Sequence, residues 1–290
     1  MKTYTGPMRF AHRGMVQDAP ENTLEAFAAA IDYGCEGIEL DLRLSKDGEV
    51  IVAHDGNFTR MTLGHPCDFT TRRLCDMTWE EISQIKLPYA NHLLDVIPPK
   101  GVKNETLAIM PERVMGQEID YVTALERDNR QTSLIRFQDF DRWFASCEKD
   151  VTIELEVKDL GVAKRMAELL KHSPNTERYI LFSGVPEYIE EIQACCGGLN
   201  KPEGLRFGAN MRELTEERKQ QIMTMDLFEV GLNAELFTAE DVQWLKERGI
   251  AVLSNLGDYP EWWEKMVTLG VLGFKTNYAQ AYTEWWNKNC

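Results

Sequence analysis

Short apolar runs alternate with amphipathic segments along most of this chain, and glycine often stands where one segment gives way to the next. Such a pattern is typical of strands followed by helices in a parallel sheet. Runs of strand character lie at about 8–11, 37–44, 49–53, 151–157, 179–182, 205–209, 227–232, 250–254 and 272–276. Helical spacing of apolar residues marks about 23–33, 78–86, 137–147, 162–170, 186–194, 215–225, 239–248 and 262–269.

The number of these units predicts an α/β fold in which the sheet closes into a (β/α)8 TIM barrel. Nine runs of strand character are present, whereas a barrel uses eight, so either the third or the last run is expected to be irregular. Only about six residues separate the second run from the third, which is too few for a helix. If both runs were parallel barrel strands, an extended loop would have to return the chain.

The segment from about residue 63 to residue 133 breaks the pattern. Four prolines between residues 88 and 111 interrupt any long element there, and one helix is expected at about 117–127. A stretch without regular periodicity inside a barrel is typical of an insertion between strands. We therefore interpret residues 1–290 as one TIM-barrel domain with a variable insertion at about 63–133, after the third strand.

Composition restricts the partners and the compartment. A formal net charge of -15 argues against nonspecific binding to nucleic acid or anionic membranes, because both would repel the protein. No run approaches the ~18 apolar residues that span a bilayer, and the first residues form no apolar leader. Seven cysteines without a C-x-x-C pair fit reduced thiols. We expect a soluble cytoplasmic protein without stable membrane insertion.

The paired tryptophans at 262–263 and 285–286 are expected to pack on the outside of the barrel or against a partner subunit. A homo-oligomer is therefore compatible with the sequence.

Polar residues gather where the first three predicted strands end. His12 and Arg13 end the first strand, Glu39 and Asp41 lie near the end of the second, and His54 follows the third. In a TIM barrel the catalytic groups come from the carboxyl ends of the strands, so these side chains are expected to meet. Asn22 is explained by helix capping, although it could also approach the site with its neighbour Glu21.

The fourth strand adds further charges on one face. Glu154, Glu156 and Lys158 are spaced by two residues, so all three point the same way. One of these glutamates, together with Glu39 and Asp41, would supply three hard oxygen ligands suited to Mg²⁺ or Ca²⁺. The chain has no H-E-x-x-H pattern, which argues against a zinc site.

The remaining charged groups would complete a site for an anion. Arg13 and Lys158 could hold an anionic substrate, and His12 and His54 are suited to proton transfer near neutral pH. Each residue also has a structural interpretation. Arg13 and Lys158 could neutralise the acids as buried ion pairs, and either histidine alone could be a hydrogen-bonded structural residue. The gathering of all these groups at strand ends favours the functional interpretation.

Six motifs follow one another up to residue 62: His12-Arg13-Gly14, Pro20 to Phe27, Gly37 to Asp41, Lys46-Asp47-Gly48, His54-Asp55 and Arg60-Met61-Thr62. In this order they resemble the N-terminal signature of the glycerophosphodiester phosphodiesterase family. Glu156-Val157-Lys158 resembles the family's later E-x-K motif.

The resemblance implies a TIM barrel that hydrolyses glycerophosphodiesters, which are small molecules, to glycerol 3-phosphate and an alcohol with a divalent metal, Mg²⁺ or Ca²⁺. It implies three groups of site residues: Glu39, Asp41 and Glu156 as metal ligands, Arg13 and Lys158 as phosphate-binding residues, and His12 and His54 as general acid and base. Which histidine is the acid stays open. Glu154 stands where the family usually has asparagine, so it is expected to alter metal preference or form an ion pair.

The C-terminal half departs from the family pattern. Where the family has S-F, W-T-x-N and T-D, this chain has Ser183-Gly184, Val252 to Asn255 and Thr276-Asn277. Two aromatic residues expected near the alcohol part of the substrate are therefore missing. Two alternatives follow: a lysophospholipase D-like hydrolase of lipid head groups, and a non-catalytic barrel that binds phosphodiesters. A metal-dependent aldolase or isomerase would rest on fold analogy alone.

Overall fold

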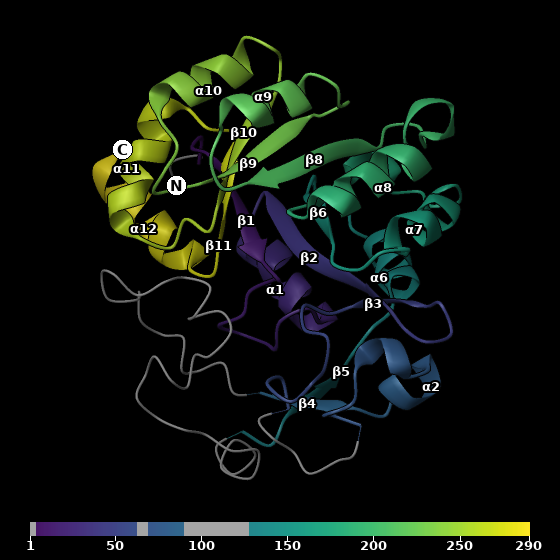
Figure 1. Ribbon diagram of the computed structural model, residues 1–290. Coiled ribbons are helices and arrows are strands. Elements are labelled where there is room, and N and C mark those ends of the chain that lie inside the picture. The colour runs from purple at the N-terminus through teal and green to yellow at the C-terminus, as the bar shows by residue number, and fades with distance from the viewer. Residues whose placement is uncertain (1–3, 63–68, 90–127) are drawn as a thin grey trace.

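The structure is a computed structural model that describes residues 4–62, 69–89 and 128–290. Within these residues a closed barrel of parallel strands is formed (Figure 1). Its strands, in order around the barrel, are β1 (Met8–His12), β2 (Gly37–Leu44), β6 (Thr152–Val157), β7 (Tyr179–Ser183), β8 (Arg206–Met211), β9 (Glu229–Asn233), β10 (Ala251–Asn255) and β11 (Gly273–Thr276). Because β11 pairs with β1 and β1 with β2, the eight parallel strands close on themselves, and the predicted TIM barrel is confirmed.

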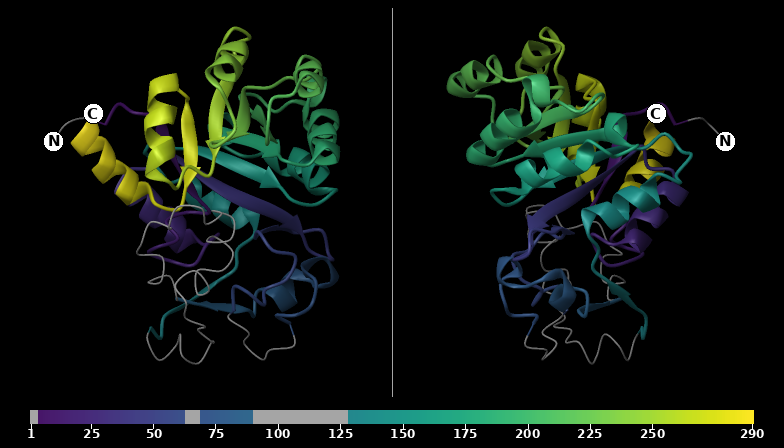
Figure 2. Two further views of the ribbon diagram at one scale, coloured as in Figure 1. Left: turned by 60° about the vertical axis from the view of Figure 1, so that its left-hand side comes forward. Right: turned by 90° about the vertical axis from the view of Figure 1, so that its right-hand side faces the viewer.

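A helix separates each barrel strand from the next. In chain order these helices are α1 (Leu24–Tyr33), α6 (Phe137–Phe144), α7 (Val162–Leu170), α8 (Pro186–Cys196), α9 (Glu216–Ile222), α10 (Ala239–Lys246), α11 (Pro260–Leu269) and α12 (Ala279–Asn289). They lie outside the strands, as the two further views also show (Figure 2). Thr23 caps α1 through its side chain, and Gly34, with φ 93°, ends it.

Either the third or the last run was expected to be irregular, and the third is the one that lies outside the barrel. β3 (Val50–Val52) pairs antiparallel with β2, so Leu44 lies opposite Val50 and Leu42 opposite Val52. An antiparallel pair needs only a tight turn, which the chain makes at residues 46–48 with Gly48 at φ 80°. No extended return loop is needed. The last predicted strand, β11, is a regular member of the barrel.

The chain leaves the barrel after β2 and returns at β6. Between them lie β3, the short helix α2 (Trp79–Ile82) and the antiparallel pair β4 (Lys86–Pro88) and β5 (Gln131–Ser133). The blue segment with α2 and β4 extends away from the barrel beyond the end of β2 (Figure 2). It packs around its own apolar cluster, which includes Met77, Ile82 and Leu87.

Two predictions in this segment need comment. A helix was expected to continue to Lys86, but α2 ends at Ile82 and Lys86 begins β4, because Leu87 is buried in the apolar cluster by pairing with β5. The capping box of Thr78 and Glu81 fixes the start of α2. The helix expected at 117–127 lies outside the described residues.

The C-terminal helix α12 was not predicted. Its aromatic residues explain the paired tryptophans, since Trp285 packs edge-on against Trp263 and Trp286 against Tyr4, with ring centroids 5.8 and 5.3 Å apart. These contacts lie within the chain, on the outside of the barrel. Among the described residues, no helix is both long enough and apolar enough to cross a membrane.

Candidate active site

Three carboxylates from two neighbouring strands meet at one end of the barrel. In the pairing of β2 with β6, Asp41 lies opposite Glu156 and Glu39 opposite Glu154, so all four side chains share the inner face. One oxygen each of Glu39, Asp41 and Glu156 lies within 4.8 Å of the others. Oxygen ligands about 2.0–2.6 Å from one cation would be separated by similar distances.

The electrostatics of this cluster fit a bound cation. Glu39 and Asp41 are buried, and Glu39 Oε1 accepts no hydrogen bond from the described part of the chain. Burial raises the pKa of Glu39 well above its usual value, and the charges of Asp41 and Glu156 raise it further. A divalent cation would offset this repulsion. Glu39, Asp41 and Glu156 are therefore suited to hold Mg²⁺ or Ca²⁺, whereas Glu154 lies outside the cluster.

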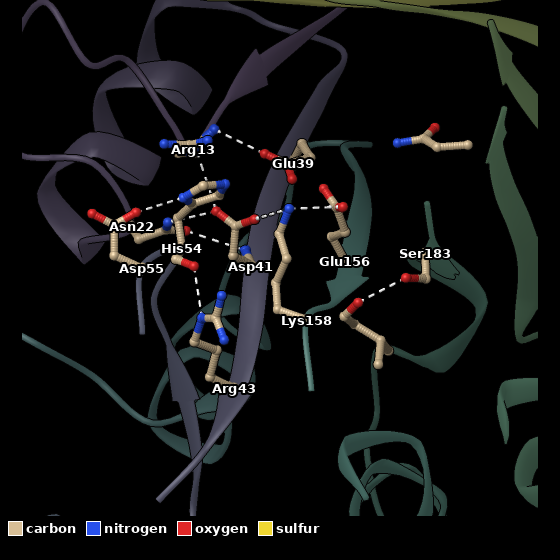
Figure 3. Close-up of polar contacts among 12 residues, drawn as sticks. Arg13, Asn22, Glu39, Asp41, Arg43, His54, Asp55, Glu156, Lys158 and Ser183 are labelled. Atoms are coloured by element: carbon tan, nitrogen blue, oxygen red, sulfur yellow. Dashed lines mark hydrogen bonds and ion pairs between the residues drawn. The ribbon is translucent and has the colours of Figure 1, made fainter. Parts of the chain in front are cut away.

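Lys158 and Arg13 supply the positive charge next to the acids. Lys158 Nζ lies 2.7 Å from Glu156 and 3.2 Å from Asp41, between the two carboxylates (Figure 3). Arg13 lies 3.3 Å from Asp41 and 3.0 Å from Glu21. Although burial alone would raise the pKa of Asp41, Lys158 and Arg13 lower it, so this carboxylate stays charged. Lys158 is the more accessible cation, since its side chain is 19% exposed and that of Arg13 is 5% exposed.

The backbone at Arg13 and Asn22 is bent to bring both side chains to the site. Each has a positive φ, 60° for Arg13 and 58° for Asn22, which is rare for residues other than glycine. The amide of Asn22 donates to Asp41 Oδ2 at 2.9 Å, and its oxygen accepts from the Asp41 backbone N–H at 3.3 Å. Asn22 thus fixes Asp41, and Thr23 rather than Asn22 caps the helix. Strained backbone of this kind is often found at functional sites.

His12, at the end of β1, faces the same cluster. Its Nδ1 lies 3.0 Å from Oδ1 of Asn277, and its Nε2 lies 4.0 Å from Glu39 Oε2. Burial lowers the pKa of His12 well below its usual value, and the charge of Arg13 lowers it further. The ring is therefore neutral at physiological pH.

His54 has a different environment. Its Nδ1 lies 2.7 Å from Asp55 Oδ1, and its side chain is 23% exposed, so it reaches the mouth of the site. Asp55 also accepts from Arg60 Nε at 2.7 Å, and Arg60 continues to Glu21 at 2.7 Å. Although burial would raise the pKa of Asp55, its hydrogen bonds with His54 and Arg60 lower it. The carboxylate of Asp55 thus links His54 to the ion pair of Arg60 and Glu21.

Glu154 forms an ion pair with Lys275, one of the two outcomes expected for this residue. It lies 3.0 Å from Lys275 Nζ on β11, inside the barrel and below the carboxylate cluster. Both residues are buried, and Lys275 also lies within 3.4 Å of Oδ1 of Asn210 and of Asn255. Burial and the nearby Glu154 raise the pKa of Glu229 well above its usual value, so Glu229 is held protonated next to this pair.

All seven predicted site residues thus lie near the carboxyl ends of β1, β2 and β6 or in the segment that follows β3. In Figure 3 the side chains of Asp41, Glu156 and Lys158 point toward one another. Three further residues contact these groups although no role was predicted for them: Asp55, Arg60 and Asn277. Asp55 and Arg60 stand in two of the six motifs and Asn277 in the position of T-D, so these motifs were the signals for such roles.

A sequence model described as the glycerophosphoryl diester phosphodiesterase family matches residues 12–281 of this chain. The chain belongs to this family. The matched residues therefore include every barrel strand except the first residues of β1. They also include the C-terminal half of the chain, in which individual motifs differ from the family pattern.

Curated relatives match over shorter stretches. Glycerophosphodiester phosphodiesterase 1 of Bos taurus is 46% identical over 84 residues, which are 29% of this chain and 23% of that protein. A glycerophosphodiester phosphodiesterase of Bacillus altitudinis is 37% identical over 99 residues, 32% of this chain and 40% of the relative. The aligned parts therefore span less than half of either relative's length.

Solved structures resemble the whole barrel. A glycerophosphodiester phosphodiesterase from Parabacteroides distasonis aligns with a TM-score of 0.66 and 15% identity over 99% of both chains. A phosphodiesterase from Oleispira antarctica, in complex with the product sn-glycerol-3-phosphate, aligns with a TM-score of 0.69 and 20% identity over 97% of both chains. At these identities the likeness shows the shared fold of the phosphodiesterase family.

Proposed function

We propose that this protein is a metal-dependent phosphodiesterase that hydrolyses glycerophosphodiesters to glycerol 3-phosphate and an alcohol. The observation that carries this proposal is the meeting of three carboxylates, one accessible lysine and two histidines at the mouth of the barrel. Membership of the phosphodiesterase family supports it. The product bound to the Oleispira antarctica enzyme supports glycerol 3-phosphate as one product.

Glu39, Asp41 and Glu156 would hold the metal, Mg²⁺ or Ca²⁺, through carboxylate oxygens. When bound, such an ion polarises the phosphoryl oxygens and offsets the negative charge that develops during displacement at phosphorus. Asn22 would keep Asp41 in place through the pair of hydrogen bonds between them.

Lys158 would bind the phosphate from the accessible side of the cluster. Its ammonium group already lies between Asp41 and Glu156, and a phosphodiester oxygen could be added as a third partner. Arg13, the more buried cation, would bind the same phosphate through its guanidinium group. Its contacts with Glu21 and Asp41 fix the orientation of that group. Both cations would orient the phosphorus for in-line attack.

The two histidines would divide the proton transfers. His12 is neutral and its Nε2 faces the carboxylate cluster, so it would take the proton of the attacking hydroxyl. His54 is oriented by its hydrogen bond to Asp55 and lies at the more exposed mouth of the site, so it would donate a proton to the leaving alcohol. The attacking hydroxyl would belong either to water or to the glycerol carbon next to the phosphate ester. In the second case a cyclic phosphate would form first and would then be hydrolysed.

A panel of glycerophosphodiesters, assayed with and without a chelator, tests this function. We expect glycerol 3-phosphate to be released from at least one of them, to stop with chelator, and to return with Mg²⁺ or Ca²⁺. His12→Ala and His54→Ala should each lower kcat by about 100-fold or more, because each removes a proton-transfer group. His172→Ala is the matched control, since this exposed histidine follows α7 at the opposite end of the barrel.

Turnover by either active-site variant at the wild-type rate would contradict the proposed roles. Release of choline or ethanolamine from acylated substrates only would favour the lysophospholipase D-like alternative. Binding of phosphodiesters without hydrolysis would favour the non-catalytic alternative. We also propose that the protein acts in the cytoplasm, because its cysteines are expected to be reduced thiols.

A further inference from the structure

A buried aspartate outside the carboxylate cluster is connected to His12. Asp258 lies in the loop between β10 and α11 and is fully buried. It accepts three hydrogen bonds: from Thr276 Oγ1 at 2.7 Å, from the Asn277 backbone N–H at 2.9 Å and from Asn277 Nδ2 at 2.8 Å. Two of these three donors belong to the residue whose oxygen contacts His12.

The loop that carries Asp258 is fixed on both sides. The Gly257 backbone N–H donates to the Lys275 carbonyl at 2.7 Å, and the Trp263 indole donates to the Gly257 carbonyl at 2.6 Å. Asp258 is therefore held at a set distance from β11, the strand that ends just before Asn277.

The contacts decide which way the amide of Asn277 points. A carboxylate can only accept hydrogen bonds, so Asp258 must face the nitrogen of that amide. The amide oxygen then faces His12 Nδ1 at 3.0 Å and can only accept. His12 must therefore carry its proton on Nδ1. Its Nε2 is left with a lone pair, on the side of the ring that faces Glu39.

We propose that Asp258 and Asn277 are positioning residues that hold His12 in the tautomer with the proton on Nδ1. Asp258 orients the amide, the amide orients the imidazole, and Nε2 is kept ready to accept a proton. This inference rests on the proposed function only in its kinetic part, because the tautomer exists whether or not a phosphodiester is the substrate.

The arrangement is costly for stability, which argues against a purely structural origin. Burial raises the pKa of Asp258, and its three hydrogen bonds only partly oppose this. Within the described residues, no lysine, arginine or histidine forms an ion pair with Asp258. An apolar residue would avoid that cost but would leave the Asn277 amide free to turn.

The test combines kinetics with nitrogen NMR of the histidine ring. Asp258→Asn keeps the shape but lets position 258 donate as well as accept, so the Asn277 amide can turn. In the metal-loaded enzyme we expect kcat to fall about 10-fold or more with an unchanged KM. In the same variant, the ¹⁵N shifts of His12 should change from the Nδ1–H tautomer to a mixture. Asn277→Ala should give the same two changes by removing the acceptor.

A double variant separates positioning from general destabilisation. If Asp258 acts through Asn277, Asp258→Asn lowers kcat no further once Asn277 is alanine. Asp141→Asn is the matched control. Asp141 also accepts from a hydroxyl and an asparagine amide, those of Ser173 and Asn175, but does so in α6. This control should lower stability without altering the tautomer of His12 or kcat.

Two results would overturn the inference: an unchanged Nδ1–H tautomer in Asn277→Ala, or a loss of kcat from Asp258→Asn that persists in the Asn277→Ala background. If Asp258→Asn does not fold, Asn277→Ala decides the question by its tautomer alone. If the wild-type protein hydrolyses no glycerophosphodiester, the proposed function fails, while the NMR measurement still tests the positioning.

Discussion

Lys275 and Glu154 form an ion pair in the interior of the barrel, where both partners have lost their contact with water. Such a pair contributes little net stability, because desolvation of the two charges offsets their attraction. Removal of one partner is different, since it leaves a charge buried without compensation. Although burial would lower the pKa of Lys275, Glu154 raises it, so the lysine is charged in the folded protein.

Lys275→Met should therefore lower the free energy of unfolding by about 3 kcal/mol, because Glu154 is left unpaired inside the barrel. Glu154→Gln combined with Lys275→Met should recover a large part of this loss. Urea denaturation of the three proteins measures the effect. Lys201→Met is the control, because Lys201 pairs with Asp226 at the surface, 2.7 Å away, and should change stability by less than about 1 kcal/mol. A double variant less stable than Lys275→Met would contradict this account.

The same residues show how far single positions can be predicted. A two-residue period was sufficient to place Glu154 and Glu156 on one face, but it could not distinguish the proposed metal ligand, Glu156, from the residue that forms an ion pair, Glu154. The partner that decides the matter, Lys275, lies on β11 and comes close only when the barrel closes. Asp258 was missed for the same reason, since its contact with Asn277 joins a loop to a strand end.

At the scale of elements, glycines in the strands make room for polar side chains inside the barrel. A Cβ added at Gly231 on β9 would lie 2.0 Å from Oδ1 of Asn210 on β8, and one added at Gly208 would lie 2.8 Å from Oε1 of Glu229. Asn210 of β8 thus occupies the space beside Gly231 of β9, and Glu229 of β9 occupies the space beside Gly208 of β8. Asn210 in turn contacts Lys275, so the glycines help to fix the polar interior.

Gly231→Ala should lower the free energy of unfolding by about 1–3 kcal/mol, because the new methyl group overlaps Asn210. Asn210→Ala in the same chain should restore most of this stability by removing the overlapping atoms. Thermal and urea unfolding of the single and double variants measure the effect. Gly56→Ala is the control, since a Cβ there meets no atom within 4 Å. Equal losses in the single and double variants would show that Asn210 is not the obstacle.

The elements also show which parts of the fold a pattern of apolar residues can predict. The barrel strands and the helices between them were found because each buries a regular apolar face. β3 was found as a strand, but the sequence left open whether it or the last run lies outside the barrel, because periodicity does not distinguish parallel from antiparallel pairing. α12 was missed because it packs through aromatic residues, such as Tyr282 and Trp285, rather than through an aliphatic stripe.

At the scale of the whole molecule, an acidic protein concentrates additional negative charge at the mouth of its barrel. The chain carries a formal net charge of -15, and an excess of negative charge attracts cations over long range. At the mouth of the barrel, burial and the charges of Asp41 and Glu156 raise the pKa of Glu39, so its protonated form is favoured in the folded state. A divalent metal would compete with that proton for the same carboxylate.

The pH dependence of metal stabilisation should therefore have a definite sign. Because the pKa of Glu39 is raised on folding, its contribution to stability is present below the unfolded pKa and is lost as pH rises toward the folded pKa. Mg²⁺ or Ca²⁺ replaces the proton, so the metal-induced rise in Tm should be larger near pH 8 than near pH 5, by roughly a few degrees. Glu39→Gln should weaken the metal effect and remove most of its pH dependence, whereas Glu190→Gln, on an exposed face of α8, should leave both unchanged. Thermal unfolding with metal and with chelator at both pH values provides the measurement. A metal-induced shift that is equal at the two pH values in the wild-type protein would mean that Glu39 gives up no proton to the ion.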